Sequence, residues 1–444
     1  MKIALSVAGS DSGAGAGIQA DIKTFSALGV YGCTAITAIT AQNTRGVSEI
    51  LEVSPRVIEQ QISSLMNDMP PDAVKIGMVY SSQTIEVVYR SLKKSRIPIV
   101  LDPILAAGTG AKLLRDDAID SFVSKLIPLC TLITPNRMEA ERLADMKIRS
   151  KEDGIDAARR IKKLGAQNVV VKGGHTGTLS VTDLLLDIRG RVTEITNPRV
   201  MIKESHGSGC NFSSAVTAYL AKGFSLHDAC RAANEYVYTA IKNAVRIGKG
   251  LPVTNPLSAI YRDAQRYQVI SELQAAVEQV VALDGFYRLI PETQTNFVYA
   301  LPDATEASEV AGVRGRIVRV GNSAVPSSYI EFGASRHMAS AVIGYMRVNP
   351  AFRSVINIRF ADKLIKICKS LFSVSSYDRS KEPLRTKRKE GSSVLWGTMQ
   401  ALSKNPNAEV IFHRGDIGKE PMITIFGKSP NEVAAKVRVI LKNY

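Results

Sequence analysis

The chain has 444 residues, 45% hydrophobic and 22% charged, so it is long enough for more than one domain and too apolar for a disordered protein. No run approaches the ~18 apolar residues of a membrane-spanning helix, and the opening apolar stretch is too short for a signal peptide. The five cysteines are scattered without a Cys-x-x-Cys pair, which excludes a zinc ribbon and favours a reducing compartment. We expect a cytoplasmic protein with no membrane partner.

The net charge of +16 is spread over the whole chain. From residue 261 onward 26 Lys+Arg stand against 17 Asp+Glu, a net +9, and the first 260 residues carry +7. Basic pockets for phosphorylated metabolites and nucleic-acid surfaces give the same signal. The only dense basic run, Arg385–Lys389, is typical of a solvated loop. We expect small-molecule partners and no nucleic acid.

In the first part of the chain, short apolar runs alternate with helical patterns. The alternation predicts parallel β-α-β units, and therefore a doubly wound α/β sheet with ligands at the carboxyl ends of its strands. The pattern stops near Gly250–Pro256, where two prolines predict a domain boundary. The expected strands are Lys2–Ala8, Ala73–Ile76, Ile97–Leu101, Thr131–Thr134 and Asn168–Val171.

A second α/β domain is expected over residues 257–444. It begins with an amphipathic helix within 257–284, whose packing between domains or between subunits of a homo-oligomer stays open. Further helices are predicted near Ser335, near Ser393 and at Ser429, where a capping-box pattern occurs. The expected strands are Asn296–Leu301, Arg316–Val320, Val355–Phe360, Glu409–Phe412 and Met422–Phe426.

A glycine-rich loop, Gly9–Asp21, follows the first strand. It is neither a Walker loop nor the spaced dinucleotide fingerprint. Its glycines would let the backbone approach a ligand closely, but a tight strand-to-helix turn has the same composition. Both interpretations stay open on these residues alone.

A second motif, His206–Ala215, places small residues before a helical stretch. Backbone N–H groups and the positive helix end would stabilise an anion there, such as a phosphoryl group in transfer. Cys210 falls in the first turn, where the helix dipole lowers a thiol pKa, so a thiolate could accept a proton. A buried structural cysteine is the alternative.

These two motifs occur together with Lys75–Met78, Asp102-Pro103, Thr134–Glu139 and Lys172–His175. Their order and spacing resemble hydroxymethylpyrimidine and phosphomethylpyrimidine kinases, the ThiD-type enzymes of thiamine synthesis in the ribokinase-like superfamily. The resemblance covers residues 1–256, which we take as the kinase domain. Ala106–Gly108, Asn211 and Gly250–Pro252 depart from the usual family pattern at positions near the nucleotide and the lid.

The resemblance implies that Cys210 is the base that activates the hydroxymethyl group. The backbone of Gly207, Ser208 and Gly209 would form the anion hole. ATP is the expected co-substrate and Mg²⁺ the expected cofactor. Family positions for the aminopyrimidine fall on Gln42, Gly9, Asp21 and Met78, and those for Mg²⁺-ATP on Lys172, Asp102, Asn136 and Glu139.

Basic clusters characterise the second domain. Ser335 is a reasonable N-cap that would place Arg336 and His337 in the first turn of a helix, where cationic groups and the helix end attract an anion such as pyrophosphate. Surface salt bridging is the alternative for such loops. The other clusters are Arg314–Arg316, Tyr377–Arg379 and His413–Glu420.

These clusters resemble the ThiN-type thiamine-phosphate synthase domain, an α/β/α unit similar to class II aldolases without their zinc histidines. The resemblance implies that hydroxymethylpyrimidine diphosphate is joined to hydroxyethylthiazole phosphate, with release of pyrophosphate. It assigns the main roles to Arg316 and His337. Arg336, Arg379, Arg414 and Lys419 are expected to bind phosphate, and Asp378 or Asp416 could hold Mg²⁺.

Two alternatives compete with a bifunctional enzyme. The second domain could be a sensor that binds thiamine phosphate, or a nucleic-acid-binding regulator, because such domains also occur beside helix-turn-helix modules; no helix-turn-helix pattern is found here. The kinase could also act on pyridoxal, although Gln42 and Cys210 favour the pyrimidine. We expect the bifunctional enzyme.

Overall fold

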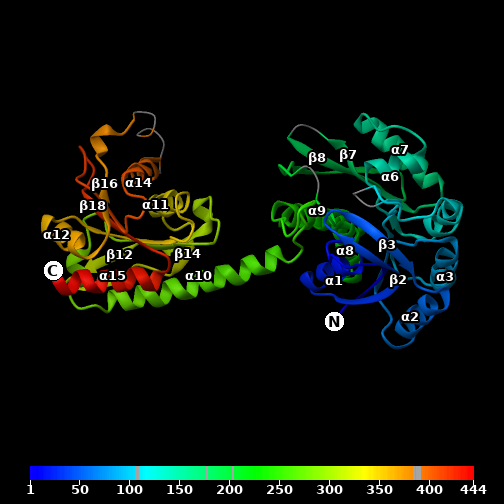
Figure 1. The fold of residues 1–444 in the computed structure, drawn as a ribbon, viewed down its shortest axis with the longest axis horizontal. Coiled ribbons are helices and arrows are strands. Elements are labelled where there is room, and N and C mark those ends of the chain that lie inside the picture. Colours follow the sequence, from blue (N-terminus) through cyan, green and yellow to red (C-terminus); the bar gives the residue numbers. More distant parts are fainter. Residues whose placement is uncertain (107–109, 177–178, 203–204, 384–385, 387–391) are drawn as a thin grey trace. The chain divides into compact units, whose positions relative to one another are not determined.

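The computed structural model describes residues 1–106, 110–176, 179–202, 205–383, 386 and 392–444. Residues 107 and 108, where the sequence departs from the kinase pattern, and all but Thr386 of the dense basic run lie outside this part of the chain. The chain divides into two compact units, Met1–Tyr261 and Arg262–Tyr444, and each is described by itself (Figure 1). The boundary expected after residue 256 lies five residues before this division.

The first unit is built on a nine-stranded sheet in the order β3-β2-β1-β4-β5-β6-β7-β8-β9. Neighbours from β2 to β7 run parallel, whereas β3, β8 and β9 pair antiparallel. The sheet is therefore doubly wound with antiparallel strands at its edges. The strands are β1 (Ile3–Asp11), β2 (Tyr31–Asn43), β3 (Gly46–Glu52), β4 (Ala73–Ile76), β5 (Ile99–Leu101), β6 (Leu132–Ile133), β7 (Asn168–Thr176), β8 (Ser180–Leu186) and β9 (Val192–Pro198).

Helices cover both faces of this sheet, with α1, α8 and α9 on one face and α2, α3, α6 and α7 on the other (Figure 1). Because both faces are covered, the central parallel strands are almost continuously buried. The helices are α1 (Gly17–Ala27), α2 (Pro55–Asp68), α3 (Ser82–Leu92), α4 (Ile119–Ser121), η2 (Phe122–Leu126), α5 (Ile127–Leu129), α6 (Arg137–Ala144), α7 (Lys151–Lys163), α8 (Ser208–Ala221) and α9 (Leu226–Lys242).

All five strands expected in this unit are present, with ends that differ by a few residues. Strands β2, β3, β8 and β9 were not predicted from the sequence. Strand β2 is rich in Ala and Thr, so its apolar signal is weak although it lies next to β1. Strands β8 and β9 form an antiparallel extension that a pure β-α-β pattern does not predict.

The second unit is built on a seven-stranded sheet in the order β14-β11-β10-β15-β18-β17-β16, in which only β16 and β17 run parallel. A separate hairpin joins β12 and β13. The strands are β10 (Phe297–Ala300), β11 (Val310–Val313), β12 (Ile317–Val320), β13 (Ser323–Pro326), β14 (Ile330–Phe332), β15 (Ser354–Arg359), β16 (Val374–Ser376), β17 (Val410–His413) and β18 (Met422–Gly427).

Helices form the outer layers of this unit, with α10 and α15 side by side on one face and α11 and α14 on the other (Figure 1). The predicted amphipathic helix is α10, which buries Leu273, Val277 and Val280 in the core. The helices are α10 (Ser258–Val281), α11 (Arg336–Met346), α12 (Asp362–Leu371), α14 (Ser392–Lys404) and α15 (Pro430–Asn443).

The helix starts expected from capping residues are confirmed. The Ser335 hydroxyl accepts the Met338 N–H at 3.4 Å, and the Ser429 hydroxyl accepts the Glu432 N–H at 3.3 Å. The Glu432 carboxylate caps the N–H of Lys428 instead of that of Ser429. Strands β11, β13, β14 and β16 and helix α12 were not predicted.

No helix in the described ranges combines the length and the hydrophobicity that crossing a membrane requires. All five cysteines are buried thiols, in keeping with their scattered positions.

Ile425 provides a test of the second core. It lies fully buried in β18 between Ile356 and Val410. Ile425→Ala should lower the free energy of unfolding of this unit by ~2–5 kcal/mol, since it removes buried methyl groups and leaves a cavity. Urea unfolding followed by the fluorescence of Trp396, the single tryptophan, measures it. Ile417→Ala, at a 99% exposed residue, should stay within ~0.5 kcal/mol, and an equal loss there would contradict the assignment.

Candidate functional site

The first unit contains a pocket of about 770 Å³ at the carboxyl ends of its parallel strands. Its walls come from the β1–α1 loop, the end of β2, the segments after β4, β5 and β6, strand β7 and the start of α8. In doubly wound sheets this edge is where ligands bind. Of the residues predicted for the kinase, those that line the pocket are Gly9, Gln42, Met78, Asp102, Asn136, Glu139, Lys172, Gly207, Ser208, Gly209 and Cys210.

The start of α8 forms one wall of this pocket. Its N-cap is Gly207 with φ +91°, a backbone conformation that favours glycine. A Cβ on Gly207 would lie 1.9 Å from the carbonyl oxygen of Gly15, so only glycine allows the two segments to meet. The first N–H groups of α8 have no acceptor within the helix and face the pocket with the positive helix end. A Cβ on Gly209 would lie 3.3 Å from Nζ of Lys172, which places a cation beside these donors.

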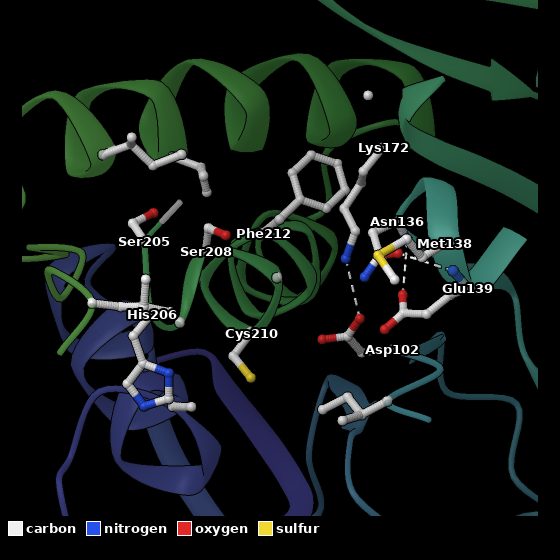
Figure 2. A pocket seen from close by; sticks show the side chains of 18 of the residues that line it. Asp102, Asn136, Met138, Glu139, Lys172, Ser205, His206, Ser208, Cys210 and Phe212 are labelled. Carbon is white, nitrogen blue, oxygen red and sulfur yellow. Dashed lines mark hydrogen bonds and ion pairs between the residues drawn. The ribbon is translucent and has the colours of Figure 1, made fainter. Parts of the chain in front are cut away.

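Cys210 lies in the first turn of α8, and 7% of its surface is exposed (Figure 2). Burial raises the pKa of its thiol to about 11, against the opposing effect of the nearby Lys75 ammonium. The backbone N–H of Gly17 donates to the sulfur and favours the thiolate. Cys210 is therefore a neutral thiol at pH 7 in the ligand-free protein. The Gly17 N–H and the Lys75 ammonium would nevertheless stabilise its thiolate.

Beneath Cys210 is a fully buried ion pair between Lys75 and Asp21. Lys75 Nζ lies 2.8 and 3.0 Å from the two Asp21 carboxylate oxygens, and both side chains are 0% exposed. The hydroxyls of Ser6 and Ser214 donate to the same carboxylate at 2.5 and 2.7 Å. Burial would lower the pKa of Lys75, but Asp21, together with Cys210 and Asp102, outweighs it and raises the pKa.

Asp21 is a correction to the sequence analysis, which expected it in the pyrimidine pocket. Its carboxylate is saturated by four protein hydrogen bonds, and it is not among the lining residues. The pattern indicated a polar anchor after the glycine loop but could not show that Lys75, 54 residues later, would bind it.

A polar group lies on the other side of Cys210, as Figure 2 shows. Lys172 Nζ donates to Asp102 at 3.2 Å, and Asn136 and Glu139 form a reciprocal capping box at the start of α6, with distances of 2.7 and 2.9 Å. Burial raises the pKa of Glu139 to about 7, with Lys172 opposing and Asp102 adding to the shift. Burial would lower the pKa of Lys172, but Asp102 and Glu139 outweigh it and keep the ammonium charged.

Gly9, Met78 and Gln42 line another part of the pocket. A Cβ on Gly9 would lie 2.8 Å from the sulfur of Met78, so the absent side chain leaves room for Met78 in the wall. The side-chain amide of Gln42 lies between His206 and Thr40, at 3.2 Å from each.

His206 in turn lies 3.0 Å from a carboxylate oxygen of Asp11. Burial would raise the pKa of Asp11, but the contact with His206 and the N–H groups of Ala16 and Gly13 outweigh it and lower the pKa. From the sequence, His206 was predicted only as part of its motif, and no role was predicted for Asp11 or Lys75. Asp11 ends β1 and Lys75 lies near the end of the neighbouring strand β4, and this position could have indicated that both belong to the site.

In the second unit, one edge of the sheet gathers residues from several distant segments. Strand register places the end of β11, the start of β10 and the end of β15 at this edge. Arg316, with φ +77°, donates to the carbonyl of Thr293. Glu420 accepts the N–H and the hydroxyl of Thr293 at 2.9 and 2.6 Å. Burial would raise the pKa of Glu420, but these hydrogen bonds and Arg359 lower it.

Arg336 and His337 form the exposed first turn of α11. Ala334, just before this turn, lies 3.6 Å from the position of a Cβ on Gly312, which brings the helix start to strand β11. The structure therefore places the predicted helical anion site beside the strand that leads to Arg316.

A buried group lies at the ends of β16 and β17. The rings of Tyr377 and His413 are 5.0 Å apart, and Arg379 lies 3.8 Å from the Glu382 carboxylate. Burial, with Arg379 adding to it, lowers the pKa of His413 to about 4, so its imidazole is neutral at pH 7. Its Nδ1 accepts the N–H of Gly415 at 3.1 Å, which leaves the proton on Nε2.

The remaining predicted residues of this unit have local partners. Arg414 pairs with Asp362 at 3.2 Å, and both side chains are about 70% exposed. Asp416 and Lys419 close a tight turn, and Asp378 caps the Ser380 N–H at 3.0 Å. Within the described part of the chain, no three His, Cys, Asp or Glu side chains gather as a metal site.

Comparison with known proteins shows to which family the chain belongs. The family described as Phosphomethylpyrimidine kinase matches residues 11–255, and the family described as Thiamine-phosphate synthase ThiN matches residues 272–439. The bifunctional thiamine biosynthesis protein ThiDN of Methanocaldococcus jannaschii is 30% identical over 446 residues, with 100% of this chain and 99% of that protein covered. This chain belongs to the ThiDN family. It is a two-domain transferase of thiamine biosynthesis, a kinase followed by a synthase domain.

Two further relatives cover only the ThiDN kinase domain. The hydroxymethylpyrimidine/phosphomethylpyrimidine kinase of Bacillus subtilis is 45% identical over 254 residues, 57% of this chain and 93% of that protein. The pyridoxal kinase of Bacillus subtilis, solved as an ADP complex, is 34% identical with a TM-score of 0.55, and covers 59% of this chain and 99% of that one. The expected ribokinase-like fold of the kinase domain is confirmed.

The protonation of Cys210 can be measured directly. In the ligand-free protein, alkylation of Cys210 by iodoacetamide should be slow at pH 7 and rise about tenfold per pH unit between pH 7 and 10, because a thiol with a pKa of about 11 gains thiolate in that proportion. Peptide mass spectrometry assigns the adduct, and Cys210→Ser should remove it. A rate that is already constant above pH 7 would show a thiolate at neutral pH and contradict this result.

Proposed function

We propose that residues 1–256 phosphorylate hydroxymethylpyrimidine and then its monophosphate with ATP, and that residues 257–444 couple the diphosphate to hydroxyethylthiazole phosphate. The observation that supports the kinase assignment most is the convergence of a ring pocket, a thiol and a helix start in one cavity of about 770 Å³. We further propose a cytoplasmic enzyme. The product of the first domain is then the substrate of the second.

In the kinase step, the hydroxymethyl oxygen attacks the γ-phosphorus of ATP and ADP leaves. The hydroxyl proton passes to Cys210 in its thiolate form, after the resting thiol has released its own proton to water. The Gly17 N–H and the Lys75 ammonium stabilise the thiolate that accepts it. The N–H groups of Ser208 and Gly209, with Lys172 beside them, stabilise the charge on the transferred phosphoryl group. The second phosphorylation uses a phosphate oxygen as nucleophile, which has no proton to lose.

Mg²⁺ fits this site through the carboxylates of Asp102 and Glu139, because Mg²⁺ bound to ATP takes one or two carboxylates in addition to phosphate oxygens. The metal would neutralise phosphate charge. Lys172 contacts Asp102 and lies beside the start of α8, so its ammonium would attract phosphate oxygens to the anion hole.

Cys210→Ser tests the kinase mechanism. A serine hydroxyl is a far weaker proton acceptor than a thiolate, so kcat for hydroxymethylpyrimidine should fall by about 10²–10⁴-fold with little change in KM for ATP. ADP formation measures it. Cys230→Ala removes another fully buried thiol of the same unit and should keep activity within about twofold. A kcat in Cys210→Ser equal to that of the control would exclude Cys210 as the base.

In the synthase step, the carbon–oxygen bond to pyrophosphate breaks and the thiazole nitrogen forms the new bond to that carbon. The aminopyrimidine delocalises the cation that develops, so the protein mainly stabilises leaving-group charge and orients the thiazole. Arg316, Arg336 and His337 supply cationic or donor groups near strand β11. Arg379, Arg414 and Lys419 stand at the loops of the same edge and are the second group of phosphate ligands.

The synthase is tested in the full chain without ATP, with hydroxymethylpyrimidine diphosphate, thiazole phosphate and Mg²⁺ supplied, so that the kinase is bypassed. Arg316→Ala and His337→Ala should each lower thiamine phosphate formation by about 10²-fold or more, because each removes stabilisation of the leaving pyrophosphate. Arg438→Ala is the matched control, because it removes an exposed arginine side chain of α15, and it should leave the rate unchanged.

The same assay decides between synthase and sensor. A folded wild-type chain that binds thiamine phosphate but releases no pyrophosphate would overturn the synthase proposal and leave a kinase with a sensor domain. Thiamine phosphate formation with full rates in both variants would keep the synthase but overturn its proposed residues.

A further inference from the structure

The amide of Gln42 is held between two protein groups whose own protons are fixed. One side of the amide lies 3.2 Å from Nε2 of His206, and the other lies 3.2 Å from the hydroxyl oxygen of Thr40. All three residues line the kinase pocket. An amide has one accepting and one donating end, so each neighbour decides which end it can face.

Asp11 determines the proton on His206. Its carboxylate accepts the N–H groups of Gly13, Gly15 and Ala16, and these bonds keep it ionised, so it can only accept. Its oxygen lies 3.0 Å from His206 Nε2, which must therefore carry a proton. A nitrogen that carries a proton cannot accept from an amide NH₂. The end of Gln42 that faces His206 must therefore be its oxygen, which shares the Nε2–H of His206 with Asp11 in a three-centre hydrogen bond.

Thr40 leads independently to the same orientation. Its hydroxyl donates to the carbonyl of Ser10 at 2.9 Å, which uses its only proton. The hydroxyl oxygen can then accept from Gln42 but cannot donate to it. The end of Gln42 that faces Thr40 must be its NH₂. The hydrogen-bond network therefore places the Gln42 oxygen beside His206 and the Gln42 NH₂ beside Thr40.

We propose that His206, backed by Asp11, and Thr40 are specificity-determining positioning residues that fix the Gln42 amide with its oxygen toward His206 and its nitrogen toward Thr40. One lone pair of the oxygen and one N–H remain for the ligand. The pocket thus presents an acceptor beside a donor in one fixed order. This inference rests on the proposed function, in which Gln42 binds the pyrimidine.

The fixed order determines which way the substrate ring faces. A 4-aminopyrimidine offers an amino donor beside a ring-nitrogen acceptor, so its amino group pairs with the Gln42 oxygen and its ring nitrogen with the amide N–H. The hydroxymethyl carbon is attached at C5, on the far side of the amino-bearing carbon. It therefore lies on the His206 side of Gln42, and His206 directly precedes the Gly207–Cys210 start of α8. The reverse amide would turn the ring over and direct the hydroxymethyl group away from Cys210.

The same order rejects related rings. In the 4-oxo analogue of the substrate, a carbonyl replaces the amino group and the ring nitrogen carries a proton, so donor and acceptor are exchanged. In the productive orientation, oxygen would face oxygen and N–H would face N–H. A site built for one hydrogen-bond order discriminates against the wrong one by up to about 10⁴-fold. Pyridoxal lacks the adjacent amino and ring-nitrogen pair altogether.

The test compares kcat/KM for the 4-amino substrate and the 4-oxo analogue in the full-length enzyme. The informative variants are His206→Leu, Thr40→Val and the double variant, which free the amide to rotate. The amino-to-oxo preference should fall by about tenfold or more in the double variant, since each lost hydrogen bond contributes on the order of tenfold. The conservative variant His206→Gln keeps a donor beside the Gln42 oxygen, and Thr40→Ser keeps an acceptor beside the Gln42 NH₂. Both should retain most of the amino-to-oxo preference.

His227→Leu is the matched control, because it breaks another histidine–aspartate contact of the same domain, at 3.3 Å from Asp187 and away from the pocket. It should leave the preference unchanged. Equal losses for both substrates in the double variant, with the preference intact, would overturn the proposal and leave His206 and Thr40 as structural residues. A wild-type enzyme that phosphorylates neither pyrimidine would instead overturn the proposed kinase function, so the two failures are distinguishable.

Discussion

The kinase site depends on one close approach, between the glycine loop after β1 and the start of α8. The two segments are about 190 residues apart, and they meet because Gly207 has a positive φ and leaves space for the carbonyl of Gly15. This contact brings the N–H of Gly17 to the sulfur of Cys210 and the carboxylate of Asp11 to the ring of His206. The positions of the Cys210 thiol and of His206 beside Gln42 therefore both depend on this contact.

A second constraint lies below the pocket floor. Lys75 and Asp21 are charged and fully buried, and removing either partner of such a pair typically costs about 3–5 kcal/mol. The pair connects β4 to α1, and the Ser214 hydroxyl connects it to α8, one turn after Cys210. The ammonium therefore stands at a fixed place beneath the sulfur. A mobile surface lysine would be screened by water and would favour the thiolate much less.

Motifs and spacing predicted which chemistry occurs at the first site, and strand periodicity predicted the sheet edge that carries it. They could not predict partners that approach from distant strands: Lys75 takes the carboxylate of Asp21, and His206 contacts Asp11, 195 residues earlier. Helix caps depend on residues close in sequence, so the helix starts at Ser335 and Ser429 could be predicted correctly. Strand β2 was missed because Ala and Thr carry little apolar signal, although burial in the sheet comes from its neighbours.

The two proposed sites differ in the kind of charge that their reactions need. The proposed kinase step needs a group that takes up a proton, and the Cys210 thiolate proposed for it would be stabilised by Lys75 and the Gly17 N–H. The proposed synthase chemistry needs permanent positive charge for a leaving pyrophosphate, and guanidinium groups keep theirs at every physiological pH. His413 agrees with this division: burial and Arg379 hold its pKa near 4, so it stays neutral and adds no charge that would vary with pH. Its Nε2–H is therefore a constant neutral donor beside Tyr377, while the neighbouring Arg379 carries the charge.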